Sequence, residues 1–410
     1  DLMSVLLNKA LFIVSSTAQV KMFKTIITEL SFDFEVKVIN TDKYFIEIDN
    51  LLREYKFQFE TLDDWTMETV NDILEKEKPN IIVTGNDQNM MDVIFIEAAN
   101  NRNLPSLTVQ DGILVADRKL ANIDLSLIHK MSYITKIPLR LINFLFLDRH
   151  PIKYKISAMI FDLKYRRKHP FLYGHGNSSK IALFSKPVKD MLISEGVSNK
   201  KLEVTGNPKF DELIYYNGNS KKELYKEKWG IDLEKKVVLV LTQCFVEVGL
   251  WNKEQRKEFI SSIAEAVSKL DNVQLVIKLH PPHEKKEDYI MVLENFDFNP
   301  IIFDGEPLNE IISTSDVVIS VSSTAALEAM ALKKPIIIVN LFGDDTSFFK
   351  NSGSFYVDHR EEIICRIKEL LAEPELNNYK RNIFVNEQIH LLDGKAYKRI
   401  SNLIRSMVKD

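Results

Sequence analysis

Residues 315–341, SDVVISVSSTAALEAMALKKPIIIVNL, contain the pattern that decides the fold class. The β-branched run at 316–320 predicts a buried parallel strand, and a helix is expected over 325–332. A Lys-Lys-Pro sequence ends that helix, because proline cannot continue it, and a second buried strand follows at 335–339. The stretch therefore predicts one strand–helix–strand unit of a parallel sheet.

The turn between this strand and this helix has the chemistry of an anion site. Ser322, Ser323 and Thr324 place hydroxyls beside the free N–H groups of a helix N-terminus, which suits a phosphate. Glu328 lies one helical turn further on, where a carboxylate can bind a ribose diol. The turn predicts a nucleotide phosphate site, although a Ser or Thr that only caps its own helix explains this stretch equally well.

The totals describe a globular protein of more than one domain. A length of 410 residues is too great for one ordinary core and predicts two domains. The formal charge of −4 argues against a general nucleic-acid binder, whose surface would be basic. The two cysteines, Cys244 and Cys365, lie far apart in the sequence, so neither a disulfide framework nor a zinc cluster is indicated and a cytoplasmic location is expected.

The first half of the chain alternates strands and helices. Strands are expected at 9–15, 34–39, 80–84 and 105–109, and an amphipathic helix at 63–78 follows a charged stretch of variable character. Such alternation predicts a doubly wound parallel sheet, in which ligands bind beyond the carboxyl ends of the strands. The loops to consider are therefore those at 15–18, 85–88 and 110–114.

The region 114–171 breaks this pattern, because it is apolar yet locally basic. Residues 130–169 contain ten Lys and Arg residues against two acidic residues, Asp148 and Asp162. This asymmetry predicts contact with a membrane surface, through a basic apolar insertion that is too short to span a bilayer. A pair of core helices with a solvated basic face is the alternative.

The second half repeats the alternation after a lysine-rich connection at 215–236, which we expect to be a linker. Strands are expected at the positions 237–242, 274–279, 300–303, 317–320 and 336–339. Three loops then share the carboxyl edge of one sheet, and they carry Thr242-Gln243, His280-Pro281 and Ser322-Ser323. Two helical segments, 377–386 and 395–408, are expected to close the chain.

Taken together, these features resemble the GT-B glycosyltransferases and the related UDP-N-acetylglucosamine 2-epimerases. The resemblance rests on the Ser-Ser-Thr turn with Glu328 and on four further stretches: Val20-Lys21-Met22, the run 204–208 with Asp211, the run 278–281, and the run 393–396 with Arg399. It implies two Rossmann-like doubly wound domains facing a cleft. These would be an acceptor domain at 1–214 carrying the insertion, a nucleotide-sugar donor domain at 237–376, and C-terminal helices at 377–410 crossing back to the first domain.

The resemblance also implies roles for particular residues. The donor nucleotide sugar would be bound by Thr242, Gln243, His280, Pro281, Ser322, Ser323, Thr324 and Glu328, with His280 stabilising the departing phosphate. Asp111 would be the general base on an acceptor hydroxyl, with Asp87 as the second candidate, and Ser16, Thr17 and Gly112 would lie on the acceptor side. For either aspartate, capping of the next helix or turn is the alternative. No metal or cofactor is implied.

Differences from the epimerase pattern favour a transferase. The Arg-Pro-Glu of the first epimerase loop is replaced by Thr17-Ala18-Gln19, the Glu-Ala-Gly-Leu-Arg pattern is replaced at Gln110-Asp111-Gly112, and the Pro-Glu-Glu pattern has no match. The Asp-Gly, His-Pro and Ser-Ser elements instead resemble bacterial sialyl- and capsule-polysaccharide transferases.

We therefore expect transfer of a sugar to a glycan or lipid-linked acceptor in surface polysaccharide synthesis, at the inner face of the membrane. Three alternatives stay open. They are a UDP-N-acetylglucosamine 2-epimerase-like enzyme, a CDP-glycerol-type glycerophosphotransferase, and a sugar-nucleotide-binding protein that has lost catalysis. The chain resembles the CDP-glycerol glycerophosphotransferases in its His-Pro and Ser-Ser elements. It differs from them at Asp111, which replaces the histidine that this family usually has on the acceptor side.

Overall fold

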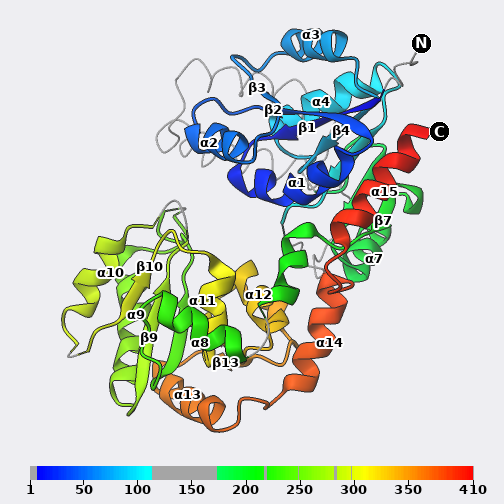
Figure 1. Cartoon of the computed structure of the whole chain (residues 1–410). Coiled ribbons are helices and arrows are strands. Elements are labelled where there is room, and N and C mark those ends of the chain that lie inside the picture. Colours follow the sequence, from blue (N-terminus) through cyan, green and yellow to red (C-terminus); the bar gives the residue numbers. More distant parts are fainter. Residues whose placement is uncertain are drawn as a thin grey trace. The chain divides into compact units, whose positions relative to one another are not determined.

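The chain forms two compact units in the computed structural model, which describes residues 7–112, 173–216, 219–247, 249–280, 284–296 and 298–409. Unit 1 comprises Asp1–Asp211 and Ile389–Asp410, and unit 2 comprises Glu212–Gln388 (Figure 1). The insertion expected at 114–171 and the predicted donor residue Pro281 lie outside the described residues. Within the described ranges, no helix has the length and apolar character needed to cross a membrane.

Unit 1 is built on a sheet of seven parallel strands. Their order across the sheet is β3 (Phe59–Thr61), β2 (Phe34–Asn40), β1 (Asn8–Val14), β4 (Ile81–Thr84), β5 (Ser106–Val109), β6 (Lys180–Leu183) and β7 (Leu202–Val204). The chain winds outward from β1 to β3, and then returns to β4 on the other side of β1. The winding direction therefore reverses between β1 and β4, which is where a doubly wound sheet opens a crevice at its carboxyl edge.

Helices cover both faces of this sheet. One face packs against α1 (Thr17–Leu30), α2 (Ile46–Glu54) and α15 (Ala396–Lys409), and the other against α3 (Met67–Glu77) and α4 (Met90–Asn100). Along β1, Phe12 points to the first face and Ile13 to the second, as alternation along a strand requires. Burial on both faces explains why the strands are continuous apolar runs in the sequence. Further along the sheet, α7 (Lys186–Ser194) packs against β6 and β7.

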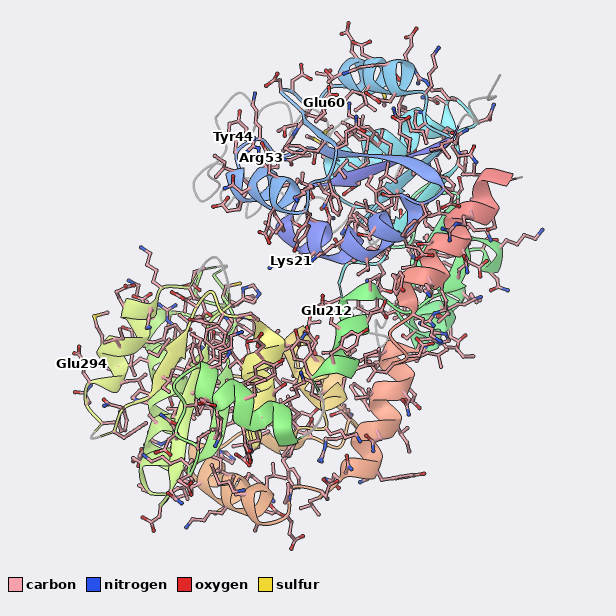
Figure 2. The ribbon with its side chains drawn as sticks, in the orientation of Figure 1. Lys21, Tyr44, Arg53, Glu60, Glu212 and Glu294 are labelled. Carbon is pink, nitrogen blue, oxygen red and sulfur yellow. The ribbon has the colours of Figure 1, made fainter. Side chains whose placement is uncertain are left out.

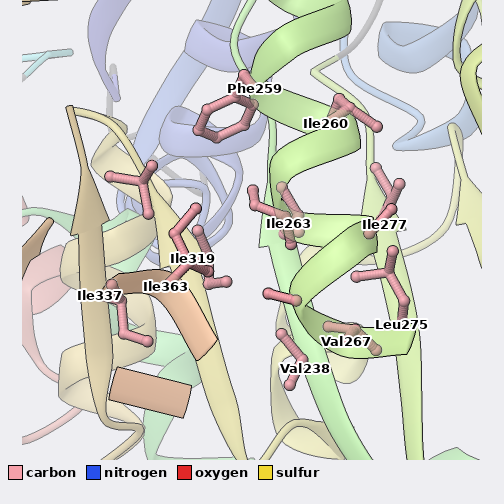
Figure 3. Packing of buried hydrophobic residues seen from close by; sticks show 14 of the residues in the cluster. Val238, Phe259, Ile260, Ile263, Val267, Leu275, Ile277, Ile319, Ile337 and Ile363 are labelled. Atoms are coloured by element: carbon pink, nitrogen blue, oxygen red, sulfur yellow. The ribbon is translucent and has the colours of Figure 1, made fainter. Parts of the chain in front are cut away.

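Unit 2 contains a second parallel sheet, of six strands. Their order is β10 (Ile301–Phe303), β9 (Val273–Lys278), β8 (Lys236–Leu241), β11 (Val317–Ser320), β12 (Ile336–Val339) and β13 (Phe355–Val357). One face packs against α9 (Lys253–Ser268) and α13 (Ile363–Ala372) through a cluster that includes Phe259, Ile263 and Ile363 (Figure 3). The winding reverses between β8 and β11, so this sheet has the same kind of crevice as the first.

The remaining helices of unit 2 complete the alternation. They are α8 (Asn219–Lys228), α10 (Lys286–Leu293), α11 (Leu308–Thr314), α12 (Thr324–Ala331) and α14 (Asn378–Ile389). Helix α11 contacts both α8 and α12. The strand–helix–strand unit predicted from residues 315–341 is present as β11, α12 and β12.

The two doubly wound parallel sheets predicted from the sequence are confirmed, but three elements were missed. Helix α2 begins at Ile46, after an N-cap residue, Phe45, whose side chain makes no capping hydrogen bond, and β3 is only three residues long. Neither element therefore carries the usual sequence signal. Helix α8 lies inside the connection at 215–236 that we expected to be irregular, and it is mostly polar. Its Lys226 is buried and donates hydrogen bonds to the carbonyls of Asp232 and Lys235, which closes the turn after the helix.

The C-terminal helix α15 is attached to unit 1 at its N-terminus. The carboxylate of Asp211 accepts hydrogen bonds from the backbone N–H groups of Ala396 and Tyr397, both at 2.9 Å. Nε of Arg399 donates to the carbonyl of Thr205 at 2.7 Å. Two of the stretches on which the family resemblance was based, 204–208 with Asp211 and 393–396 with Arg399, therefore lie together in the fold. Their contacts cap α15 and attach it to unit 1.

We predict that Asp211→Ala lowers the free energy of unfolding of unit 1 by about 1–3 kcal/mol, because the buried N–H of Ala396 and the partly buried N–H of Tyr397 lose their acceptor. Asp211→Asn, which keeps one acceptor oxygen, should lose less. Urea unfolding of the full chain measures the change. The control Asp63→Ala removes a carboxylate whose side chain is 99% exposed and should change the free energy by less than about 0.5 kcal/mol. Equal stability of the Asp211→Ala variant and the unchanged protein would contradict the capping role.

Candidate functional site

The carboxyl edge of the unit 1 sheet holds Asp111 between two carboxamides. Nε2 of Gln19 donates to Oδ2 of Asp111 at 3.0 Å, and Nδ2 of Asn86 lies 3.4 Å from its Oδ1. Oε1 of Gln19 accepts from the backbone N–H of Ser15 at 2.8 Å, which fixes the orientation of that amide. Burial raises the pKa of Asp111, and the Gln19 and Asn86 amides lower it by stabilising the ionised form. Asp111 is half-buried, so its carboxylate can act on a ligand at this edge.

The other predicted acceptor-side residues have local partners at the same edge. Ser16 is the N-cap of α1, and its Oγ accepts from the backbone N–H of Gln19 at 3.2 Å. Thr17 is the first residue of that helix. The carbonyl of Gly112 accepts from Nε2 of Gln110 at 2.7 Å. The Ser16 hydroxyl and the Gly112 carbonyl therefore already have structural contacts.

Asp87, the second candidate base, is held inside the fold. Its side chain accepts hydrogen bonds from the backbone N–H groups of Gly174 and Gly176 at 2.9 Å, and the residue is 2% exposed. Burial raises its pKa, and the two N–H donors lower it. These contacts give Asp87 a structural role in anchoring the segment before β6, which differs from the helix or turn cap considered as the alternative from the sequence.

A buried carboxyl that the sequence analysis missed lies near Asp111. Asp92, in the first turn of α4, is 1% exposed, and neither of its carboxylate oxygens has a hydrogen-bond partner among the described residues. Burial raises the pKa of Asp92 well above its usual value, and the charge of Asp111 raises it further. The only sequence signal was a charged residue inside the otherwise apolar run 90–96.

The carboxyl edge of the unit 2 sheet is bridged by Gln243. Its Oε1 accepts from the backbone N–H of Ser322 at 2.9 Å, and its Nε2 lies 3.3 Å from Oγ of Ser322. Gln243 follows β8 and Ser322 follows β11, so the bridge spans the point where the winding reverses. Ser323 is the N-cap of α12, with its Oγ accepting from the N–H of Ala325 at 3.2 Å, and Thr324 begins the helix. Four predicted donor residues, Gln243, Ser322, Ser323 and Thr324, therefore meet at one helix N-terminus.

The loop after β9 is held by a carboxylate that the sequence analysis also missed. Glu284 accepts hydrogen bonds from the backbone N–H of His280 at 2.7 Å, from the hydroxyl of Thr242 and from the hydroxyl of Tyr289. The Thr242 hydroxyl, which we expected to bind the donor, thus has a structural partner. His280 is exposed at the edge of the sheet. Three residues separate His280 from Glu284, and no spacing rule pairs them in a loop.

Two further residues complete the comparison with the sequence expectations. Glu328 lies on α12 and is 2% exposed, so its side chain is inside the helix layer. Lys21, from the family-like Val20-Lys21-Met22 run, lies on the exposed side of α1 (Figure 2). Among the residues that the structure describes, no three His, Cys, Asp or Glu side chains are grouped as metal ligands.

Comparison with known proteins identifies related sequences. The sequence model of a family described as UDP-N-acetylglucosamine 2-epimerase matches residues 176–405, which cover all of unit 2 and, in unit 1, the last two strands and most of α15. A curated UDP-N-acetylglucosamine 2-epimerase of Salmonella borreze is 24% identical over 250 residues. That alignment covers 56% of this chain and spans 62% of the length of the relative.

Solved structures share the fold over nearly the whole chain. The UDP-GlcNAc 2-epimerase of Neisseria meningitidis, crystallised with UDP-GlcNAc, is similar with a TM-score of 0.64 and 17% identity, covering 97% of this chain and 100% of that one. The wall teichoic acid polymerase TagF, in a structure with CDPG, has a TM-score of 0.57 and 11% identity, covering 98% and 89%. These likenesses confirm the GT-B type of fold that the sequence predicted.

The buried carboxyl of Asp92 leads to a prediction about pH. Because its folded-state pKa is raised, the unfolded chain loses this proton first, so stability falls as pH rises above about 4. Asp92→Asn removes that titration. Its stability advantage over the unchanged protein should grow as pH rises above about 4, by up to about 1.4 kcal/mol for each pH unit until the folded-state pKa is reached.

Urea unfolding at several pH values measures this difference. Asp63→Asn, at an exposed position, is the matched control and should show a difference that does not change with pH. An Asp92→Asn difference that is the same at pH 4 and pH 8 would contradict a neutral buried carboxyl.

Proposed function

This chain belongs to the UDP-N-acetylglucosamine 2-epimerase family, and from that premise we propose that it is an enzyme acting on UDP-N-acetylglucosamine or a close UDP-sugar. The observation that carries the proposal is the Gln243–Ser322 bridge at the N-terminus of α12, which lies inside the segment matched by the family. On this proposal unit 2 binds the nucleotide, and Asp111 of unit 1 supplies acid–base chemistry.

The nucleotide side rests on the electrostatics of a helix N-terminus. The positive end of α12 and the hydroxyls of Ser322, Ser323 and Thr324 suit a diphosphate. Gln243 occupies the N–H of Ser322 and Oγ of Ser323 occupies the N–H of Ala325, so the N–H of Thr324 and the hydroxyls of this turn would receive the phosphate oxygens. His280, exposed after β9 in the same sheet, would stabilise charge on the departing diphosphate. The ribose role of Glu328 stays a prediction.

The first candidate reaction is epimerisation at carbon 2 of the sugar. That carbon has no neighbouring carbonyl, so its hydrogen is not acidic, and its loss must be coupled to departure of the diphosphate from carbon 1. The proton would pass to Asp111, the C–H electron pair would form the carbon 1–carbon 2 double bond, and the C–O pair would leave with the diphosphate. Return of the proton to the opposite face, with the diphosphate adding back, gives the epimer. A carboxyl whose pKa is raised by burial suits a base of this kind.

The second candidate reaction is transfer of the sugar to an acceptor hydroxyl, and one observation favours it. The amides that surround Asp111, from Gln19 and Asn86, are neutral, and buried Gln110 stands where the epimerase pattern has its first Glu. A single base is enough for transfer, because the acceptor hydroxyl loses one proton as the glycosidic bond forms. The family match begins at residue 176 and so does not include Asp111.

Incubation with UDP-N-acetylglucosamine in D2O separates the two reactions. Epimerisation predicts incorporation of deuterium at carbon 2 of the sugar, which NMR measures. Asp111→Asn should lower the rate of this incorporation by at least about 100-fold because the base is lost. Asp63→Asn should leave the rate unchanged. Release of UDP that needs an added glycan acceptor, with no deuterium at carbon 2, would establish transfer instead.

Calorimetric binding of UDP to the full chain tests the nucleotide side separately. We expect Gln243→Ala to weaken binding by about tenfold, equivalent to about 1.4 kcal/mol, because the Ser322 loop loses its bridge. Gln274→Ala is the matched control, since Gln274 lies near the amino end of β9 and bonds the N–H of Asp232. CDP should bind more weakly than UDP. If the Gln243→Ala variant and the unchanged protein bind UDP with equal affinity, the Gln243–Ser322 bridge does not contribute to the nucleotide site.

A further inference from the structure

The side chain of Asn207 holds the backbone immediately before Asp111. Asn207 follows β7 and is 2% exposed. Its Nδ2 donates to the carbonyl of Gln110 at 2.6 Å and contacts Sδ of Met22 on α1 at 3.1 Å. Its Oδ1 accepts from the backbone N–H of Lys209 at 2.8 Å, which fixes the orientation of the amide in a turn. One side chain therefore joins the end of β5, helix α1 and the turn after β7.

The side chain of Gln110 holds the backbone immediately after Asp111. Gln110 is fully buried, its Oε1 accepts from the N–H of Phe184 at 2.9 Å, and its Nε2 donates to the carbonyl of Gly112 at 2.7 Å. Its own N–H donates to the carbonyl of Ala182 at 3.0 Å, which continues the sheet pairing. The carbonyls on either side of Asp111 are thus each bound by a buried carboxamide.

We propose that Asn207 is a positioning residue for Asp111, acting through the Gln110 carbonyl. This inference rests on the proposed function, in which Asp111 is the base. The Asp111 side chain is aimed by Gln19 and Asn86, but its Cα is placed by the peptide groups that Asn207 and Gln110 hold. A displacement of about 1 Å at a catalytic group can cost about 100-fold in rate. Asn207 touches no reacting atom on this account.

The route from Asn207 continues to the C-terminal helix. The Asn207 turn leads into Asp211, which caps α15, and Arg399 on α15 bonds the carbonyl of Thr205 two residues before Asn207. Gly206 between them has φ +72°, and a Cβ at this position would lie 3.3 Å from the carbonyl oxygen of Ile389. Contacts with α15 therefore fix the chain both before and after Asn207. Because the position of Asn207 is fixed, its hydrogen bond to the Gln110 carbonyl also fixes the backbone next to Asp111.

Asn207→Ser separates this role from a simple turn role. A serine hydroxyl can accept from the N–H of Lys209 and keep the turn, but it is too short to reach the Gln110 carbonyl. We expect Asn207→Ser to lower kcat for UDP-N-acetylglucosamine by about 10- to 100-fold with KM changed by less than about threefold. Hydrogen exchange of the full chain should become faster at residues 110–112 in the same variant.

Asn40→Ala is the matched control. Asn40 is a fully buried asparagine at the end of β2, its Oδ1 accepts from the N–H of Asp42 at 2.9 Å, and its Nδ2 donates to Asp49 at 2.8 Å. This variant should lower stability and speed exchange near residues 40–49 without changing exchange at 110–112 or kcat. If the Asn207→Ser variant is also less stable but keeps the kcat and the exchange rate at residues 110–112 of the unchanged protein, Asn207 has a structural role only and the inference is overturned.

The two readouts separate the inference from the proposed function. Faster exchange at 110–112 in Asn207→Ser supports the positioning role even if the unchanged protein does not turn over UDP-N-acetylglucosamine, in which case the proposed function fails by itself. Unchanged exchange at 110–112 overturns the inference, whatever the activity.

Discussion

A glutamine side chain spans the reversal of winding in each unit, and the arrangement of both sheet edges depends on it. Gln19 joins the loop after β1 to Asp111 after β5, and Gln243 joins the loop after β8 to Ser322 after β11. A carboxamide suits this place because it has both an acceptor and a donor. A buried polar group without a partner costs about 1–3 kcal/mol, so the N–H of Ser15 that faces Oε1 of Gln19 also determines that Nε2 faces Asp111.

The use of amides rather than cations has a chemical consequence at Asp111. A lysine or arginine at the position of Gln19 would lower the pKa of the carboxyl and make it a poor proton acceptor. Neutral amides orient the carboxylate while burial keeps its pKa raised, which brings it closer to the working range of a general base. Orientation and basicity, which oppose each other beside a cation, are both retained here. In unit 2 the amide instead supports a helix N-terminus, where the ligand brings the charge.

The sequence predicted the sheets and their edges because continuous apolar runs and hydroxyl caps are local patterns. It placed Asp111, Gln243 and Ser322 at carboxyl ends of strands, where the structure has them. It did not predict the contacts of Gln19, Asn86 and Asn207, because those contacts join positions far apart in the chain, and spacing gives no register between α1 or β7 and β5. The stretches that contain Asp211 and Arg399 were recognised as family motifs, but their function was not predicted. Their role in capping and holding α15 depends on contacts between residues near 205–211 and residues near 396–399, which only the folded unit 1 brings together.

A crystal structure of the full chain with UDP is the most direct test of the central claim that the nucleotide binds at the Gln243–Ser322 edge. The account predicts diphosphate density at the first turn of α12, within hydrogen-bond distance of Ser323 or Thr324, with the Gln243 bridge intact. Ordered UDP at the unit 1 edge beside Ser16 and Asp111, with the N-terminus of α12 unoccupied, would contradict it.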